Sequence, residues 1–269
     1  MRFEKIQNTC IPKVGFGTWR IGGEGLPDSK KDNDSLAALK SALSIGYRHF
    51  DTAESYAAGH AEELLGLAVQ ESGIPRGDLF ITSKVSPDHL SYESVLSSFE
   101  NSLKRLKMDY LDLYLIHWPR RGMNLADTFR ALNQLVCDGR VRHLGVSNFK
   151  LKELREAVAL SQSPLFTNQV SYSIPDRRMV ENGLLDYCRQ QSILITAYTP
   201  INHRNTRSSK TIQRIAETRG CTREQVALAW LVSQPGVITI PMSFNPQHQR
   251  ENFQAADIQL TAEEMELLG

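Results

Sequence analysis

The sequence predicts an α/β fold in which eight parallel strands, each followed by a helix, close into a (β/α)8 TIM barrel. Two observations lead to this prediction. Short apolar segments alternate with segments of helical pattern, and a polar residue stands at the end of nearly every apolar segment. The length of 269 residues is typical of one such barrel, so we expect a single domain over residues 1–269.

The apolar segments have the length and composition of buried strands. Several are almost continuously apolar, as parallel strands covered on both faces should be. The eight segments are residues 14–18, 47–51, 79–84, 111–117, 141–147, 165–169, 193–198 and 237–241. Residues 2–13 precede the first of them and are predicted to form a β-hairpin that closes the bottom of the barrel.

Helix-capping residues mark where the intervening helices should begin and end. Gly46 stands where the first helix should stop, because glycine readily adopts the left-handed conformation of a helix end. A threonine followed three residues later by Gln or Glu, as at 222–225 and 261–264, is a capping-box pattern. The residues expected to cap helix starts are Asp34, Ser91, Thr222, Asn245 and Thr261.

Polar residues at the strand ends distinguish a closed barrel from an open, doubly wound sheet. A barrel brings the carboxyl ends of all its strands around one mouth, whereas an open sheet concentrates its ligands at one switch point. Polar residues follow seven consecutive predicted strands, which favours closure. They are Asp51, Lys84, His117, Ser147, Asn148, Gln169, Tyr198 and Ser243.

The overall composition indicates a small-molecule partner. The 31 basic and 30 acidic residues leave a formal net charge of +1, so nothing suggests a nucleic-acid or membrane surface. The four cysteines are scattered without metal-ligand spacing, and a reducing cytoplasm is the simplest interpretation. Residues 1–5 show no apolar signal segment, and no apolar run approaches the ~18 residues of a membrane helix. We expect a cytoplasmic monomer with no bound metal.

The predicted second, third and fourth strands bring Asp51, Tyr56, Lys84 and His117 together at the mouth. A tyrosine hydroxyl has a pKa of about 10, and a nearby lysine ammonium is expected to lower that pKa. Asp51 would keep Lys84 charged, and His117 would orient a carbonyl oxygen. Tyr56 is then the predicted general acid, a role typically worth ~10²–10⁴-fold in rate.

Each of these residues taken singly also has an ordinary structural interpretation. Asp51 could cap the following turn, and Lys84 could be a strand-end charge in solvent. His117, which precedes a Trp-Pro pair, could be a packing histidine. Only their joint placement makes a catalytic interpretation preferable.

The chain resembles the aldo-keto reductases over nearly its whole length, in the bacterial type with short loops. The segments that carry the resemblance are GFGTW at 15–19, YRHFDTAESY at 47–56, FITSK at 80–84, LDLYLIHWP at 111–119, VRHLGVSNF at 141–149, NQ at 168–169, AYTP at 197–200 and IPMS at 240–243. In this family the motif positions of Asp51, Tyr56, Lys84 and His117 form a catalytic tetrad. Hydride passes to the substrate directly from NADPH, or less often NADH, without a metal.

The sequence contains neither a dinucleotide-binding glycine motif after a strand nor a P-loop, so a nicotinamide would bind through side chains at the mouth. The resemblance implies that Ser147, Asn148 and Gln169 hydrogen-bond the carboxamide and that Tyr198 stacks on the ring. The full set of implied cofactor-binding residues is Gly17, Thr18, Trp19, Asp51, Ser147, Asn148, Gln169, Tyr198, Thr199, Pro200, Ile201, Ser243, His248, Glu251 and Asn252.

The adenosine end departs from the family pattern. Met242 and His248 stand where the family usually has Lys and Arg, which bind the 2′-phosphate of NADP(H). NADP(H) remains the expected cofactor, but we hypothesise either relaxed choice that admits NAD(H) or a phosphate contact made by His248 or Arg250. The segment 200–209, which is basic over 201–207, could close over the cofactor pyrophosphate, or it could be a solvated loop.

The predicted substrate pocket is lined by Trp19, Tyr56, His117 and Trp118. Such an aromatic cleft suits an aldehyde or ketone with an apolar body. The loop after Trp118 is short and the chain ends soon after a final helix, without the long C-terminal loop that walls the pocket in some family members. We therefore expect an open site and broad carbonyl specificity.

Two other functions remain as alternatives. One is a nucleotide-binding regulatory subunit of the same fold, which would not need catalysis. A degraded tetrad or an added N-terminal tail would favour it, and neither is seen in this sequence. A metal-dependent barrel hydrolase would use Asp51 and His117 as ligands, but it needs further His or Asp ligands at strand ends.

Overall fold

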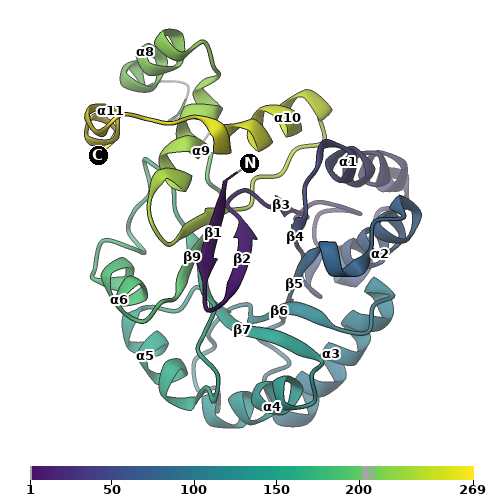
Figure 1. Cartoon of the computed structure of the whole chain (residues 1–269). Helices are drawn as coiled ribbons and strands as arrows, with labels where there is room; N and C mark the ends of the chain where they lie inside the picture. The colour runs from purple at the N-terminus through teal and green to yellow at the C-terminus, as the bar shows by residue number, and fades with distance from the viewer. Residues whose placement is uncertain (1, 202–205, 207–208) are drawn as a thin grey trace.

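The computed structural model describes residues 2–201, 206 and 209–269, and its centre is a sheet of eight parallel strands (Figure 1). Strands that follow one another in the sequence are neighbours in the sheet, from β3 to β10. The strands are β3 (Phe16–Gly17), β4 (His49–Asp51), β5 (Phe80–Val85), β6 (Leu111–Ile116), β7 (Val141–Ser147), β8 (Thr167–Ser171), β9 (Leu194–Tyr198) and β10 (Val237–Thr239). Each overlaps one predicted segment, so all eight strand predictions are confirmed, with small differences at the ends.

The sheet closes on itself between its first and last strands. Val14 forms a parallel bridge with Thr239, and the Gly15 amide donates a hydrogen bond to the Thr239 carbonyl at 2.8 Å. Gly17 lies so close to this seam that a Cβ atom on it would stand 2.7 Å from the carbonyl oxygen of Ile240. The seam therefore needs a glycine there, and the closed barrel is confirmed.

The predicted N-terminal hairpin is also confirmed. Strands β1 (Phe3–Ile6) and β2 (Thr9–Pro12) pair antiparallel and cross the open end of the barrel that faces the viewer in Figure 1. The Thr9 hydroxyl lies 2.9 Å from His143 Nε2, and the Gln7 side chain donates to the Leu165 carbonyl at 2.8 Å. These bonds fix the hairpin to the bottom of the barrel.

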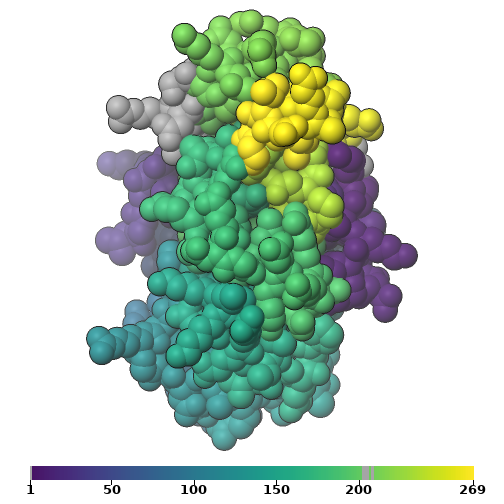
Figure 2. All heavy atoms as spheres, turned by 90° about the vertical axis from the view of Figure 1, so that its left-hand side faces the viewer, coloured from purple at the N-terminus to yellow at the C-terminus, as the bar shows by residue number. Residues whose placement is uncertain are grey.

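Helices surround the barrel as an outer layer (Figure 1). They are α1 (Asp32–Ile45), α2 (His60–Ser72), α3 (Tyr92–Leu106), α4 (Leu125–Cys137), α5 (Leu151–Leu160), α6 (Leu184–Gln190), α8 (Lys210–Arg219), α9 (Arg223–Ser233), α10 (Pro246–Gln254) and α11 (Ala262–Leu268). Figure 2 shows α11, in yellow, packed beside α8, in green, where Arg219 pairs with Glu264. None of the helices in the described part of the chain is both long and apolar enough to cross a membrane.

Most of the predicted helix caps are formed. The side chains of Ser91, Thr222, Asn245 and Thr261 each accept a hydrogen bond from a backbone amide in the first turn that follows. The prediction for Asp34 is wrong. A short 3-10 turn, Ser29–Lys31, leads directly into α1, so that helix begins at Asp32 and Asp34 lies within its first turn.

Apolar side chains fill the end of the barrel that the N-terminal hairpin covers. A cluster of buried residues, one of them from the hairpin, occupies the interior between the strands. Its members are Ile11, Leu113, Leu115, Phe166, Leu194 and Ile238. Because this end is filled and covered, access to the barrel interior comes from the opposite end, at the carboxyl ends of the strands.

Candidate active site

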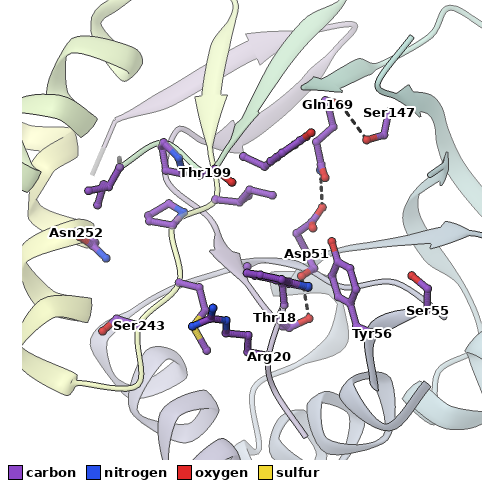
Figure 3. A pocket seen from close by; sticks show the side chains of 18 of the residues that line it. Thr18, Arg20, Asp51, Ser55, Tyr56, Ser147, Gln169, Thr199, Ser243 and Asn252 are labelled. Carbon is purple, nitrogen blue, oxygen red and sulfur yellow. Dashed lines mark hydrogen bonds between the residues drawn. The ribbon is translucent and has the colours of Figure 1, made fainter. Parts of the chain in front are cut away.

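An open cavity of about 970 Å³ lies at the carboxyl ends of the strands, a volume near the upper end for small-molecule and cofactor sites. Every residue that the sequence assigned to cofactor or substrate binding lines it, and Figure 3 shows part of this wall. These residues are Gly17, Thr18, Trp19, Asp51, Tyr56, His117, Trp118, Ser147, Asn148, Gln169, Tyr198, Thr199, Pro200, Ile201, Ser243, His248, Glu251 and Asn252.

Lys84 lies directly beneath the cavity at the end of β5 and is fully buried. Its ammonium group donates to Asp51 Oδ1 at 2.5 Å, to the Thr52 carbonyl at 2.8 Å and to the Tyr56 hydroxyl at 3.2 Å. These three bonds use all three ammonium protons, so the group has a fixed direction. Burial alone would lower the pKa of Lys84, but the adjacent Asp51 carboxylate raises it above its ordinary value. Lys84 is therefore charged.

Asp51 is the link between the tetrad and the rest of the cavity. Its second oxygen, Oδ2, accepts a hydrogen bond from Gln169 Nε2 at 2.7 Å, and Figure 3 shows Asp51 between Tyr56 and Gln169. The Thr18 amide binds the Asp51 carbonyl at 2.9 Å. The carboxylate thus has partners on both oxygens in a buried position, as a buried charge requires.

The pKa of Tyr56 differs from the sequence-based expectation. Burial raises this pKa above its ordinary value, and the opposing effect of the Lys84 charge, although present, is smaller. The expectation of a lowered pKa therefore had the direction of the lysine effect right and the net result wrong. At neutral pH the phenol carries its proton.

His117, just past the end of β6, is neutral. Burial, with a smaller contribution from the Lys84 charge, lowers its pKa to about 3. Its Nδ1 atom lies 3.2 Å from the Ser55 hydroxyl, and its ring meets the Tyr56 ring edge-on with centroids 5.5 Å apart. If Nδ1 accepts the serine proton, Nε2 carries the ring proton and is a hydrogen-bond donor.

A hydrogen-bonded group of amides and hydroxyls extends from β7 to β9. The Ser147 hydroxyl donates to the Gln169 carbonyl at 2.9 Å, and the Tyr198 hydroxyl donates to Asn148 Oδ1 at 2.8 Å. The Asn148 side-chain amide donates to the His117 carbonyl at 3.2 Å. These contacts tie the ends of neighbouring strands together and hold the polar wall beside the tetrad.

The far end of the cavity lies at the start of α10. Met242 and His248 both line it, whereas Arg250 is exposed and lies outside the lining. Of the two substitute phosphate contacts proposed from the sequence, only His248 is therefore placed at the cavity. Within the predicted basic segment 200–209, residues 202–205 and 207–208 lie outside the described residues.

The rim of the cavity carries two large aromatic side chains, Trp19 and Trp118, which are 58% and 47% exposed. The guanidinium of Arg20 lies over the Trp19 ring, 4.8 Å from its centroid. Exposed tryptophans at a cavity mouth provide apolar surface for a ligand that extends out of the cavity.

Sequence reasoning missed several lining residues. They are Arg20, Gly23, Gly25, Ser55, Ala57, Thr222, Glu224, Ile240 and Pro241. Arg20, Ser55 and Ala57 adjoin predicted residues, so neighbourhood in the sequence was an available signal. Thr222 was predicted only as a helix cap, and no local pattern shows that the start of α9 faces the cavity. Within the described residues no group of His, Cys, Asp or Glu is placed to hold a metal ion.

Comparison with known proteins covers nearly the whole chain. The sequence model of the Aldo/keto reductase family matches residues 13–268. A glyoxal reductase of Bacillus subtilis (strain 168) is 37% identical over 256 residues, 95% of this chain and 87% of that protein. The crystal structure of the thermostable aldo-keto reductase Tm1743 in complex with the inhibitor epalrestat has a TM-score of 0.95 and 43% identity, covering 100% of this chain and 98% of that one. An aldo/keto reductase from Klebsiella pneumoniae in complex with NADP and acetate has a TM-score of 0.88 and 34% identity, covering 99% of this chain and 94% of that one.

Proposed function

The chain belongs to the aldo/keto reductase family and is an oxidoreductase that reduces carbonyl groups, and we propose that Tyr56 supplies the proton in this reaction. The observation that carries the proposal is the 3.2 Å contact between the Tyr56 hydroxyl and the ammonium group of Lys84 at the base of the cavity. This contact joins a phenol that holds its proton at neutral pH to a charge that stabilises the phenolate left after transfer.

The tetrad divides the work among its members. A reduced nicotinamide, when bound, supplies hydride to the carbonyl carbon. Tyr56 gives its proton to the carbonyl oxygen, the product is an alcohol, and the phenolate recovers a proton from water. Lys84 balances the negative charge on the phenolate, and Asp51 in turn keeps Lys84 charged and oriented.

His117 is better suited to orient the carbonyl than to protonate it. A group with a pKa of about 3 is already neutral at physiological pH, so it has no readily available acidic proton. With its Nδ1 atom against Ser55, the opposite ring nitrogen can donate a hydrogen bond to the substrate oxygen. This leaves Tyr56 as the acid.

The residues at the mouth fit a nicotinamide cofactor. Ser147, Asn148 and Gln169 offer the donors and acceptors that a carboxamide needs, and Tyr198 presents a ring for stacking beside them. One solved relative was crystallised with NADP. We propose that NADP(H) is used here, bound by these residues and by the remaining predicted cofactor-binding residues that line the cavity.

NADH use is the finer part of the cofactor proposal. No lysine or arginine stands at positions 242 or 248, so the extra phosphate of NADPH has only His248 as a basic partner from these two positions. The experiment is to compare kcat/KM for NADPH and NADH, in the natural protein and in Met242→Lys. A wild-type preference for NADPH above about a hundredfold, or about 3 kcal/mol, would contradict relaxed choice. Met242→Lys should increase the preference, because it restores a charge at the phosphate position.

The open cavity and its exposed tryptophans support broad substrate specificity. Trp19 and Trp118 provide apolar surface without enclosing a ligand, and one relative is named a glyoxal reductase. We propose that the protein reduces aldehydes and ketones of varied size, small dicarbonyls included. Activity on a single bulky ketone in a panel of aldehydes and ketones would contradict this.

The decisive experiment is the loss of absorbance at 340 nm when NADPH or NADH, enzyme and a carbonyl compound are mixed, with and without a chelator. Tyr56→Phe should retain cofactor binding and lose most of the turnover. Near-normal turnover in this variant would refute the role of Tyr56. No oxidation with any carbonyl compound, but tight nucleotide binding, would favour a regulatory subunit instead.

A further inference from the structure

The turn that follows Tyr56 has an unfavourable backbone conformation. Ala57, Ala58 and Gly59 all have positive φ angles, of 48°, 51° and 94°. Left-handed conformation is costly for alanine, because its Cβ atom approaches a carbonyl oxygen. Such residues persist only where the surrounding structure holds them, and they often occur at functional sites. Contacts outside the turn must therefore keep it, and the Tyr56 that precedes it, in place.

The side chain of Arg105, near the end of α3, lies directly against this turn. A Cβ atom on Gly59 would stand 2.7 Å from both Cδ and Nε of Arg105. The arginine is itself held in two places: its Nε donates to Glu62 Oε2 at 2.7 Å and its Nη2 donates to the Ser102 hydroxyl at 3.2 Å. Arg105 thus forms a fixed support for the turn, and only glycine fits between them.

The other end of this support is attached to β5. Glu62, on α2, is fully buried, and its Oε1 accepts a hydrogen bond from the Ser83 hydroxyl at 2.5 Å. Ser83 directly precedes Lys84 on the strand, and successive side chains of a strand point to opposite faces. Lys84 therefore enters the barrel while Ser83 points outward to the helices, where α2 and α3 lie side by side (Figure 1).

We propose that Glu62 and Arg105 are positioning residues that hold the Tyr56 hydroxyl against the Lys84 ammonium from behind the barrel wall. The network begins one residue before Lys84 and ends three residues after Tyr56, so it connects the two partners of the 3.2 Å contact by a second route. Neither Glu62 nor Arg105 lines the cavity. The inference rests on the proposed role of Tyr56 as proton donor.

At the opposite end of the barrel the chain offers a control pair that is matched in distance and exposure. Arg76 Nη2 lies 2.7 Å from Asp112 Oδ2, and the side chains are 21% and 2% exposed. The corresponding values for Arg105 and Glu62 are 2.7 Å, 23% and 0%. Arg76 precedes β5 and Asp112 lies at the start of β6, away from the carboxyl ends of the strands. Loss of Arg105 removes the ion pair of the buried Glu62 carboxylate, whereas loss of Arg76 leaves Asp112 paired with Arg142, whose Nη1 lies 2.9 Å from Oδ1.

The experiment compares Arg105→Met with Arg76→Met by thermal unfolding, NADPH binding and steady-state kinetics over a range of pH. Both variants should lose stability. Only Arg105→Met should lower kcat, by about tenfold or more, with cofactor Kd and substrate KM within about twofold, because misplacement of a reacting group reduces the rate rather than binding.

The pH profile is the readout that general destabilisation would not move. Lys84 lowers the pKa of Tyr56, so separating the two should raise the apparent pKa of alcohol oxidation in Arg105→Met. Arg76→Met should keep the wild-type value. Arg105→Lys, which retains the charge without the planar guanidinium, and Ser83→Ala should each show a smaller change in the same direction. They also test the inference if Arg105→Met does not fold.

An unchanged pH profile and kcat in Arg105→Met would overturn the inference. Equal losses of kcat in Arg105→Met and Arg76→Met would overturn it as well. The proposed function fails differently. Near-normal turnover in Tyr56→Phe would remove the proton donor itself. An inactive Tyr56→Phe together with Arg105→Met that behaves like Arg76→Met would leave the proton donor in place and refute only the positioning role.

Discussion

A histidine buried in the barrel wall should make the folded protein sensitive to acid. His49, the first residue of β4, is 1% exposed, and its Nδ1 atom has no hydrogen-bond partner among the described residues. Its ring packs edge-on against Phe80 with centroids 5.4 Å apart, and the backbone of Gly15 lies close to Nδ1. Burial, with a smaller contribution from the charge of Lys84, lowers the pKa of His49 to about 3.

The size and direction of the effect follow from proton binding. In the unfolded chain this histidine has a pKa of about 6.5, so below that pH the unfolded state binds a proton at this position and the folded state does not. The stability that depends on a neutral His49 is fully present above pH ~6.5 and is lost as the pH falls toward 3. At pH 5 the loss is about 2 kcal/mol, and a shift from about 6.5 to about 3 sets a limit near 5 kcal/mol.

Urea unfolding of the wild type and of His49→Phe at pH 7.5 and pH 5 measures this loss. Phenylalanine retains an aromatic ring and removes the titrating group, so the difference in unfolding free energy between the two pH values should shrink by about 2 kcal/mol. Phe80→Leu is the control, because it disturbs the same packing and should lower stability equally at both pH values. An identical pH dependence in His49→Phe and wild type would refute the reasoning.

Three further substitutions test other parts of the structure. Lys84→Met leaves the buried Asp51 carboxylate without its ion pair and should lower the free energy of unfolding by roughly 3–5 kcal/mol, with a loss of ~10²–10⁴-fold in carbonyl reduction; wild-type stability in urea would contradict this. Gly17→Ala places a Cβ atom 2.7 Å from the Ile240 carbonyl oxygen and should cost roughly 1–3 kcal/mol by thermal unfolding; an unchanged melting temperature would contradict this. Thr222→Ala removes the cap of α9 and should cost about 1 kcal/mol in chemical denaturation, whereas Thr222→Ser should not.

The features that could be predicted from the sequence depend on local chemistry or on the topology of a barrel. Ser91 and Thr222 cap helices because each bonds an amide three residues away. The tetrad came together because parallel strands in a closed sheet all end at one mouth. The error at Asp34 arose because a preceding turn, capped by Asp28, already brings the chain into helical conformation.

The features that could not be predicted depend on contacts between distant segments. Gly59 and Arg105 are separated by a helix and a strand, and their contact exists only because α2 and α3 pack side by side. Arg20 could be noted as a neighbour of Trp19, but in the cavity wall it has a positive φ of 83°. A sequence predicts a positive φ mainly where glycine or asparagine stands, and arginine gives no such signal. Sequence patterns identify which residues end a strand, and packing decides which others support them.

The pKa of Tyr56 shows the same division in energetic terms. The presence of Lys84 beside the phenol could be inferred, and its effect does lower the pKa, but the larger effect of burial depends on how the finished site encloses the hydroxyl. The raised pKa of Tyr56 has a consequence for the direction of the reaction, reduction or oxidation. A phenol that retains its proton through neutral pH is ready for reduction, whereas alcohol oxidation needs the phenolate and should increase with pH. Lys84 then matters most during proton transfer, when negative charge develops on the phenol oxygen 3.2 Å away.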